Sequence, residues 1–196
     1  MAKLGIIGAG SWGTALAVVL EKNGHDVVIW SALEAEIQML KEHREHKDKL
    51  PGIRLADSIR YTTQMQEAVS GMDALVLAVP SMYTRQTARQ MSQYAEENQL
   101  VISVAKGIEE DTLMTLSQII RQEIPQAVPA VLCGPSHAEE VGRGMPSVLV
   151  AGAEKRKTAE RVQHYFMNEA FRVYTSPDVL GMEIGASLKN VIALAA

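Results

Sequence analysis

Gly8-Ala9-Gly10-Ser11-Trp12-Gly13 follows the apolar run Leu4-Gly5-Ile6-Ile7 and leads into a segment with helical spacing of its apolar residues. In a turn from strand to helix, each glycine has a separate task. Gly8 lets the chain turn tightly out of the strand, and Gly10 lets the backbone approach a ligand without a Cβ in between. Gly13 allows the helix to pack closely against the strand. The pattern predicts a strand-turn-helix unit at the beginning of the chain.

The start of this helix is suited to binding phosphate. The backbone amides near Ser11 and Trp12 lack helical partners and, together with the helix dipole, favour an anion. A single G-x-G-x-x-G pattern is weak evidence, since an ordinary glycine-rich turn can have it. Here it follows a strand, opens a helix and begins an alternating series, which is the context that a dinucleotide site requires. We therefore predict that Gly8, Gly10, Ser11, Trp12 and Gly13 bind a dinucleotide.

The rest of the chain alternates short apolar runs with segments of helical spacing. We expect strands at residues 4–7, 26–30, 61–63, 74–79, 100–104, 130–133, 147–150 and 171–174, and helices at 12–22, 34–47, 85–97, 112–122 and 154–167. The strands are apolar on both faces, as in a parallel sheet that helices cover on both sides. The sequence predicts an α/β fold over residues 1–179, with a doubly wound, Rossmann-type and mostly parallel sheet.

The last segment, residues 180–196, has an apolar helical pattern without a stop signal. We interpret it as the first helix of a truncated all-α domain that follows the sheet domain. The alternative interpretation is a natural C-terminal helix that docks on the sheet.

The composition limits the class of function. The chain of 196 residues is 47% hydrophobic and 21% charged, as is typical of globular proteins. A net charge of −4 and an isoelectric point near 5.8 give no general attraction to nucleic acid or anionic lipid, so an anionic substrate needs a local basic pocket. The single cysteine, Cys133, suits a reducing compartment, and no segment has the roughly 20 apolar residues of a membrane span. We expect a cytoplasmic protein without nucleic-acid or integral-membrane partners.

The end of the second expected strand leaves the type of dinucleotide open. Proteins that select NAD often place an Asp or Glu there to hold the ribose hydroxyls. Here Ser31-Ala32-Leu33 occupies that place, Glu34 follows, and no arginine is present to receive the 2′-phosphate of NADP. We predict that Ser31 contacts the adenosine ribose region.

Three further groups of residues follow expected strands and so belong at the carboxyl edge of the sheet, where ligands bind. Pro80 follows the fourth strand and is expected to line the cofactor cleft. Lys106 follows the fifth, and its ammonium group can reach a substrate oxygen or phosphate, although a solvated surface lysine would have the same pattern. Gly134-Pro135-Ser136-His137-Ala138 follows the sixth, with a helix expected to begin near Ala138. No metal-ligand spacing occurs in the sequence.

Lys189-Asn190 lies within the apolar segment at the end of the chain. Burial of a lysine, and a nearby cation such as Lys106, both disfavour the charged ammonium form, which makes such a lysine a usable base near neutral pH. The alternative is a lysine that extends from the helix face into water.

Taken together, five motifs resemble the bacterial form of the NAD(P)-dependent glycerol-3-phosphate dehydrogenases. They are Gly-Ala-Gly-Ser-Trp-Gly-Thr-Ala at 8–15, Val-Pro-Ser at 79–81, Lys-Gly-Ile-Glu at 106–109, Gly-Pro-Ser-His-Ala at 134–138 and Leu-Lys-Asn-Val at 188–191. The resemblance extends over the whole chain in the right order. It implies an oxidoreductase that moves hydride between NAD or NADP and the pair dihydroxyacetone phosphate and sn-glycerol 3-phosphate, and that supplies glycerol phosphate for phospholipid synthesis.

The resemblance also implies roles for individual residues. Cofactor contacts would come from Ser11, Trp12, Lys106 and Ala138, and substrate contacts from Lys106, Gly134, Ser136, Lys189 and Asn190. Lys189 would accept the proton of the C2 hydroxyl in oxidation and donate it in reduction. Asn190 would position the groups around it.

Two departures from the family pattern affect these expectations. The family's second strand often ends near a basic residue that favours NADPH, and Ser31-Ala32-Leu33 lacks one. Family members also continue into an α-helical substrate domain that supplies an Asp and an Arg-Asn pair and through which they commonly dimerise. The sequence ends before those residues, so we expect cofactor binding but little or no turnover from it.

Two alternative functions share these features. One is a related two-domain dehydrogenase that acts on a 3-hydroxy acid or a hydroxyacyl thioester. The other is a nicotinamide-sensing domain without chemistry, which would bind the cofactor but have no use for Lys189.

Overall fold

The computed structural model describes residues 1–195, apart from the side chain of Asn190. Its strands are β1 (Lys3–Ile7), β2 (Asp26–Trp30), β3 (Arg60–Thr62), β4 (Ala74–Leu77), β5 (Leu100–Ser103), β6 (Val128–Cys133), β7 (Ser147–Gly152) and β8 (Phe171–Ser176). Its helices are α1 (Ser11–Lys22), α2 (Glu34–His43), α3 (Met65–Val69), α4 (Thr84–Met91), α5 (Leu116–Glu123), α6 (Ala138–Gly142), α7 (Arg156–Phe166) and α8 (Val179–Ala195), with a short 3-10 helix η1 (Ser81–Tyr83).

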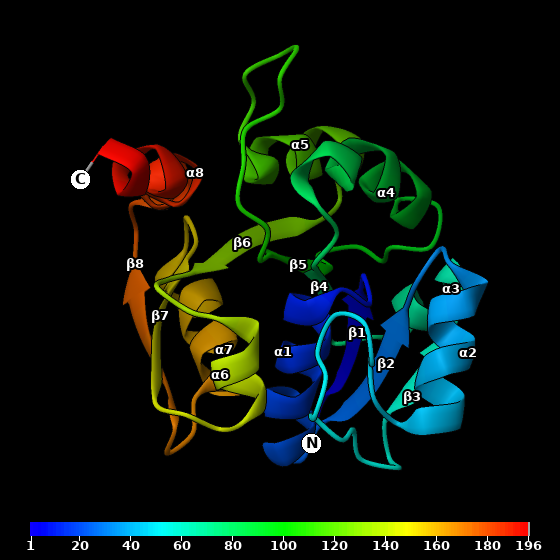
Figure 1. The fold of residues 1–196 in the computed structure, drawn as a ribbon. Coiled ribbons are helices and arrows are strands. Elements are labelled where there is room, and N and C mark those ends of the chain that lie inside the picture. Colours follow the sequence, from blue (N-terminus) through cyan, green and yellow to red (C-terminus); the bar gives the residue numbers. More distant parts are fainter. Residues whose placement is uncertain (196) are drawn as a thin grey trace.

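The strands form one sheet in the order β3-β2-β1-β4-β5-β6-β7-β8 (Figure 1). Neighbouring strands pair in parallel, except β6 and β7, which are antiparallel. From β1 the chain first proceeds outward to β3 and then returns to the other side of β1 with β4. The order therefore reverses between β1 and β4, which is where ligands bind in open α/β sheets. The expected doubly wound, mostly parallel sheet is confirmed.

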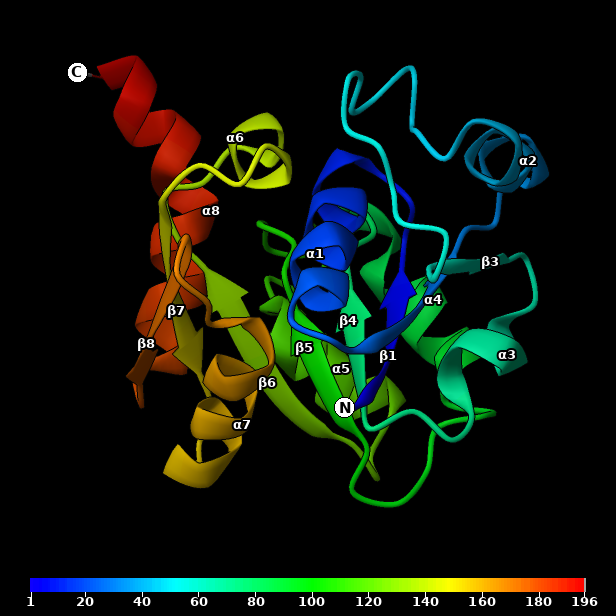
Figure 2. The same ribbon diagram turned by 90° about the horizontal axis from the view of Figure 1, so that it is seen from below.

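Helices cover both faces of this sheet (Figures 1 and 2). Successive residues of a strand point to opposite faces, so apolar residues on both faces each pack against a layer of helices. On one face Ile6 and Ile29 pack in a core with residues of α1, α2 and α7. On the other face Ile7 and Val28 pack in a second core with residues of α3, α4 and α5. This double burial explains why the strands read as continuous apolar runs.

Helix boundaries differ from the expectation in the segment before α5. We expected a helix at residues 112–122, but α5 begins at Leu116. Thr115 precedes the helix, and its backbone amide donates a hydrogen bond to the side chain of Gln118 at 2.9 Å, which marks the true N-terminus. Residues 104–115 instead form a projecting loop. The short helix α3 was not expected, and α4 ends at Met91, well before residue 97.

Helix α8 is attached to the sheet domain through a buried carboxylate. Glu183 is only 6% exposed, and it accepts hydrogen bonds from the backbone amide of Ser117 at 2.8 Å and from the Ser117 hydroxyl at 2.5 Å. The negative charge therefore lies at the N-terminus of α5, where free amides and the helix dipole favour it. Beyond this point the helix extends away from the other elements (Figure 2).

The apolar residues of α8 are exposed over most of its length: Leu180, Ile184, Leu188, Val191, Ile192 and Leu194. The sheet domain thus covers the side of the helix that carries Glu183. Within residues 1–195, no helix is both long and apolar enough to cross a lipid bilayer.

Replacing Glu183 with alanine should lower the free energy of unfolding by about 1–2 kcal/mol, because two donors at the start of α5 lose their partner. Urea unfolding monitored by circular dichroism measures the effect. Glu154→Ala is the matched control, since its exposed carboxylate also pairs with α5, through Arg121 at 2.8 Å. The control should change stability by less than about 0.5 kcal/mol. Equal losses in both variants would contradict the anchoring role of Glu183.

Candidate functional site

The glycine loop between β1 and α1 is held by contacts between backbone atoms. Gly8 has a φ of +122°, and its amide donates a hydrogen bond to the carbonyl of Trp30 at 2.9 Å. A Cβ on Gly8 would lie 2.8 Å from the carbonyl carbon of Ala78, and a Cβ on Gly13 would lie 2.1 Å from the Gly8 oxygen. The tight turn at Gly8 and the close helix packing at Gly13 are therefore both present in the structure.

Gly10 differs from the other two glycines of the loop. A Cβ placed on it would meet no described atom within 4 Å, and its φ of −65° is allowed for any residue. Open space therefore lies in front of Gly10, next to the first amides of α1 at the half-buried residues Ser11 and Trp12. An extended anionic group such as a pyrophosphate fits this place.

Thr14 supports the loop from within the helix and was not singled out from the sequence. Its fully buried hydroxyl donates a hydrogen bond to the carbonyl of Ala9 at 3.1 Å. The amide of Thr14 also bonds to the carbonyl of Gly10 at 2.9 Å. A hydroxyl residue one position after the last glycine, on the buried side of the helix, is the signal that could have indicated it.

The loops after β4 and β5 lie at the same edge of the sheet as the glycine loop. The parallel register pairs Ile7 with Leu77 and Leu77 with Ser103, so the three strands end side by side. Pro80 directly precedes η1 and is exposed at this edge. Lys106 lies in the loop after β5, and its side chain is exposed. The structure therefore brings the predicted residues Gly10, Pro80 and Lys106 to one side of the sheet.

Ser31, at the end of β2, is buried within a polar group that the sequence did not reveal. Its hydroxyl donates a hydrogen bond to Glu36 at 2.6 Å and accepts one from the amide of Leu33 at 3.1 Å. Lys49 also binds Glu36, and the ring of His46 lies 3.6 Å from the same carboxylate. Burial raises the pKa of Glu36, but the hydrogen bonds from Lys49 and Ser31 outweigh it and lower the pKa overall. The predicted contact of Ser31 with the adenosine ribose stays a prediction.

The segment after β6 is positioned by Gly134. A Cβ on this residue would lie 2.7 Å from the carbonyl oxygen of Val148, so Gly134 lets the end of β6 pass close to β7. The half-buried Ser136 follows, with its hydroxyl 3.5 Å from the Gly134 oxygen. Ala138 begins the short helix α6 and packs against the main core. The expected helix start at Ala138 is confirmed.

Lys189 lies on α8, and its side chain is exposed. Of the two alternatives that the sequence left open, burial among apolar residues is wrong for the described residues, because Leu188 and Val191 are exposed as well, and the lysine that extends from the helix face is the one present. Asn190 is in the same helix, but its side chain lies outside what the structure describes.

The charge of Lys189 acts on Lys106 although 83 positions separate the two residues in the sequence. Partial desolvation of the Lys106 ammonium lowers its pKa, and the positive charge of Lys189 lowers it further, while Cys133 acts in the opposite direction. Burial raises the pKa of the Cys133 thiol, and Lys106 opposes that rise. The loop after β5 and helix α8 therefore each contribute one lysine whose charges act on one another, in a chain whose net charge is −4, while the Glu183 carboxylate of α8 acts on Cys133 in the opposite sense to Lys106.

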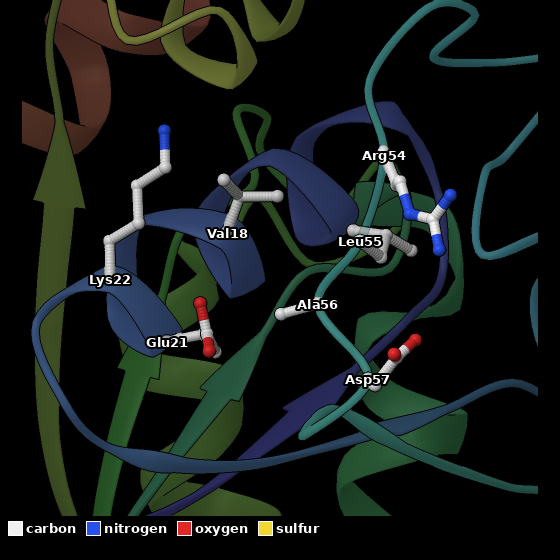
Figure 3. Close-up of a pocket in the computed structure, with 7 residues that line it drawn as sticks. All are labelled: Val18, Glu21, Lys22, Arg54, Leu55, Ala56 and Asp57. Atoms are coloured by element: carbon white, nitrogen blue, oxygen red, sulfur yellow. The ribbon is translucent and has the colours of Figure 1, made fainter.

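One pocket of the surface lies away from this edge. Figure 3 shows a pocket of about 290 Å³ between the last turns of α1, which supply Val18, Glu21 and Lys22, and residues 54–57. It is at the opposite end of α1 from the glycine loop. Among the described residues, no group of three or more His, Cys, Asp or Glu side chains could hold a metal ion.

Comparison with known proteins identifies one family over most of the chain. A family model described as the N-terminus of NAD-dependent glycerol-3-phosphate dehydrogenase matches residues 3–159. A glycerol-3-phosphate dehydrogenase [NAD(P)+] of Agathobacter rectalis is 64% identical over 196 residues, and the enzyme of that name from Bacillus subtilis is 46% identical over 199. Both alignments cover all of this chain and 58% of the relative. The chain thus spans a little more than half the length of the curated relatives it matches.

Solved structures give the same result for the fold. The crystal structure of glycerol-3-phosphate dehydrogenase from Coxiella burnetii superposes with a TM-score of 0.93 at 26% identity, covering 99% of this chain and 59% of that one. A UDP-D-ManNAc dehydrogenase from Pyrococcus horikoshii superposes with a TM-score of 0.79 at 14% identity, covering 97% of this chain and 50% of the other. The second likeness concerns the fold alone.

Two glycine-to-alanine variants should separate ligand binding from folding. Gly10→Ala should keep the stability within about 0.5 kcal/mol but abolish NADH binding, because its Cβ occupies the open space. Gly13→Ala should lower the free energy of unfolding by about 2–3 kcal/mol, because the helix must move away from Gly8. Urea unfolding and NADH fluorescence titration measure the two effects. Unchanged NADH affinity in Gly10→Ala would show that the ligand does not approach this loop.

Proposed function

The chain belongs to the NAD-dependent glycerol-3-phosphate dehydrogenase family, and on this basis we propose that it forms the cofactor-binding part and one side of the substrate site of such an enzyme. The proposed reaction interconverts dihydroxyacetone phosphate and sn-glycerol 3-phosphate with NAD or NADP. In the cell the product would supply the glycerol backbone of phospholipids. A cytoplasmic location and a homodimeric full-length protein are parts of the same proposal.

One observation carries the cofactor part of this proposal. At the point where the strand order reverses, Gly8 and Gly13 are closed in by backbone atoms, whereas Gly10 faces open space. That difference is what a dinucleotide site needs, because the turn must be rigid and the pyrophosphate must approach the amides closely. Gly8, Gly10, Ser11, Trp12 and Gly13 would hold the pyrophosphate. Pro80 and Ala138 would line the remainder of the cofactor site.

Two lysines, one after β5 and one on α8, carry the substrate part of the proposal. Lys106 and Lys189 oppose the net negative charge of the chain and favour a phosphorylated substrate over an uncharged alcohol. Gly134 and Ser136 follow the neighbouring strand and would bind the substrate through backbone and hydroxyl groups. The family match likewise favours a phosphorylated alcohol over a 3-hydroxy acid.

The proposed chemistry divides between the cofactor and Lys189. When bound, the nicotinamide dinucleotide supplies or accepts the hydride at C2 of the substrate. The Nζ atom of Lys189 gives a proton to the C2 oxygen in reduction and takes it back in oxidation. Lys106 holds an anionic oxygen of the substrate, and Asn190 positions the groups around Lys189. A non-catalytic nicotinamide sensor would not need these two lysines.

The 196-residue chain by itself should bind NADH with a dissociation constant below about 1 mM but should oxidise it with dihydroxyacetone phosphate slowly or not at all. The reason is that the chain spans 58% of its relatives, and the substrate phosphate lacks the arginine that the resemblance assigns to the remainder. Fluorescence titration measures binding, and the decay of NADH absorbance measures turnover. Turnover at the rate of a full-length relative would contradict the expected dependence on the remaining part of the site.

Ser31→Ala should change the relative affinity for NADH and NADPH, because it removes a hydrogen bond of 2.6 Å that holds Glu36 beside the end of β2. Titration of the variant with each cofactor in turn gives the two dissociation constants. Ser58→Ala is the control, since its hydroxyl binds Glu21 at 2.7 Å on α1, away from β2. Unchanged affinity for both cofactors would rule out a contact between the Ser31 group and the adenosine ribose.

A further inference from the structure

The loop at residues 104–115 carries Lys106 and projects from the sheet edge (Figure 1). Val104 at its base is buried in the main core, but its tip carries the exposed side chains of Ile108 and Leu113, so the apolar cores do not hold the tip in place. Glu109, the last residue of the Lys-Gly-Ile-Glu motif, has no part in the proposed function. Two contacts with the segment after β4 explain how this loop is fixed.

The first contact lies directly after Lys106. Gly107 has a φ of +151°, and a Cβ on it would lie 2.5 Å from the Oγ atom and 2.6 Å from the Cβ atom of Ser81. The loop backbone therefore rests against η1. This contact accounts for a glycine after Lys106, since no side chain fits between the two segments.

The second contact lies two residues further on. The guanidinium of Arg85 donates from Nε to Oε1 of Glu109 at 2.7 Å and from Nη2 to Oε2 at 2.6 Å. Its Nη1 atom donates to Glu123 of α5 at 2.5 Å. Both side chains of the Arg85–Glu109 pair are less than a quarter exposed. Arg85 therefore joins the loop to α4 and α5 with paired, charge-assisted hydrogen bonds, the strong and directional kind.

We propose that Arg85 is a positioning residue for Lys106: its bidentate pair with Glu109, together with the contact of Gly107 with Ser81, holds the loop so that the Lys106 ammonium faces the site. The inference rests on the proposed function of Lys106. Without the pair, repulsion from Lys189 and the attraction of water for an ammonium group both move Lys106 outward.

The pair stays intact across the neutral pH range. The hydrogen bonds from Arg85, followed by that from Thr112, lower the pKa of Glu109 to about 2. A carboxylate whose pKa falls on folding stabilises the folded state above its ordinary pKa, and the contribution is lost as the pH falls from about 4.5 towards 2. The Arg85–Glu109 pair should therefore hold the loop throughout the neutral pH range. The Arg85–Glu109 pair therefore stays charged and hydrogen-bonded and does not act as a pH-dependent switch.

The test follows the protonation of Lys106 directly. Lysines of the 196-residue chain are labelled with ¹³C-methyl groups, and the Lys106 signal is assigned by its absence in Lys106→Arg. The titration midpoint of Lys106 and the NADH dissociation constant are then measured in Arg85→Met, Arg85→Lys and Glu109→Gln. Arg89→Met is the matched control, because Arg89 lies one turn along α4 and binds Glu123 at 3.0 Å, on the side of α5 rather than on the loop.

In Arg85→Met and Glu109→Gln the Lys106 midpoint should rise towards the value of an ordinary lysine, because the ammonium regains its hydration. Apparent NADH affinity should fall about five- to tenfold if the loop keeps its binding geometry for about 10–20% of the time. Arg85→Lys should give the same direction of change, since an ammonium cannot form the paired contact. Arg89→Met should leave both values unchanged.

An unchanged Lys106 midpoint in folded Arg85→Met would overturn the positioning role. Circular dichroism shows whether that variant is folded, and Arg85→Lys and Glu109→Gln decide the question if it is not. Equal shifts in Arg89→Met would also overturn the role, because α4 as a whole would then be responsible. Absence of NADH binding by the unaltered chain would instead contradict the proposed function, while the Lys106 midpoints would still decide the role of Arg85.

Discussion

The structure depends on one close approach of three backbone segments: the end of β1, the start of α1 and the end of β4. There is no room for a side chain at Gly8 or Gly13, where a Cβ would lie 2.8 Å from Ala78 and 2.1 Å from the Gly8 oxygen. This contact fixes the first amides of α1 at the place where the strand order reverses. Because β4, β5 and β6 then follow in parallel, their carboxyl ends continue the same edge, and the residues after them face a common site.

The sequence was sufficient for the sheet because burial on both faces leaves a strong pattern of apolar runs. It could not show that β7 runs opposite to β6, since a strand such as 147–150 reads the same in either direction. The start of α5 was also missed, because residues 112–115 have helical spacing. What ends the loop there is the capping at Thr115 and the carboxylate of Glu183, which is 66 residues from its partner Ser117. Such distant pairings have no local signal.

In the candidate site, too, residues with a local sequence signal could be predicted and residues paired over a long distance in the sequence could not. Gly10, Pro80 and Lys106 could be predicted because each follows a recognisable strand. Partners that support them could not, because Glu36 and Lys49 are 13 residues apart and Arg85 and Glu109 are 24 apart, with no periodic pattern between them. The exposure of Lys189 was one of two alternatives between which the sequence could not decide, for a different reason. An apolar pattern shows that a helix has a face to bury, but it does not show which surface covers that face.

The attachment of α8 at Glu183 makes that residue a pivot for the helix. Lys189 lies six positions beyond it, which at 1.5 Å per residue is an arm of about 9 Å. A tilt of roughly 10° about the pivot would displace the backbone at Lys189 by only about 1.5 Å, and the backbone at residue 195 by twice as much. For such a rigid tilt about Glu183, the displacement at Lys189 is half the displacement at residue 195.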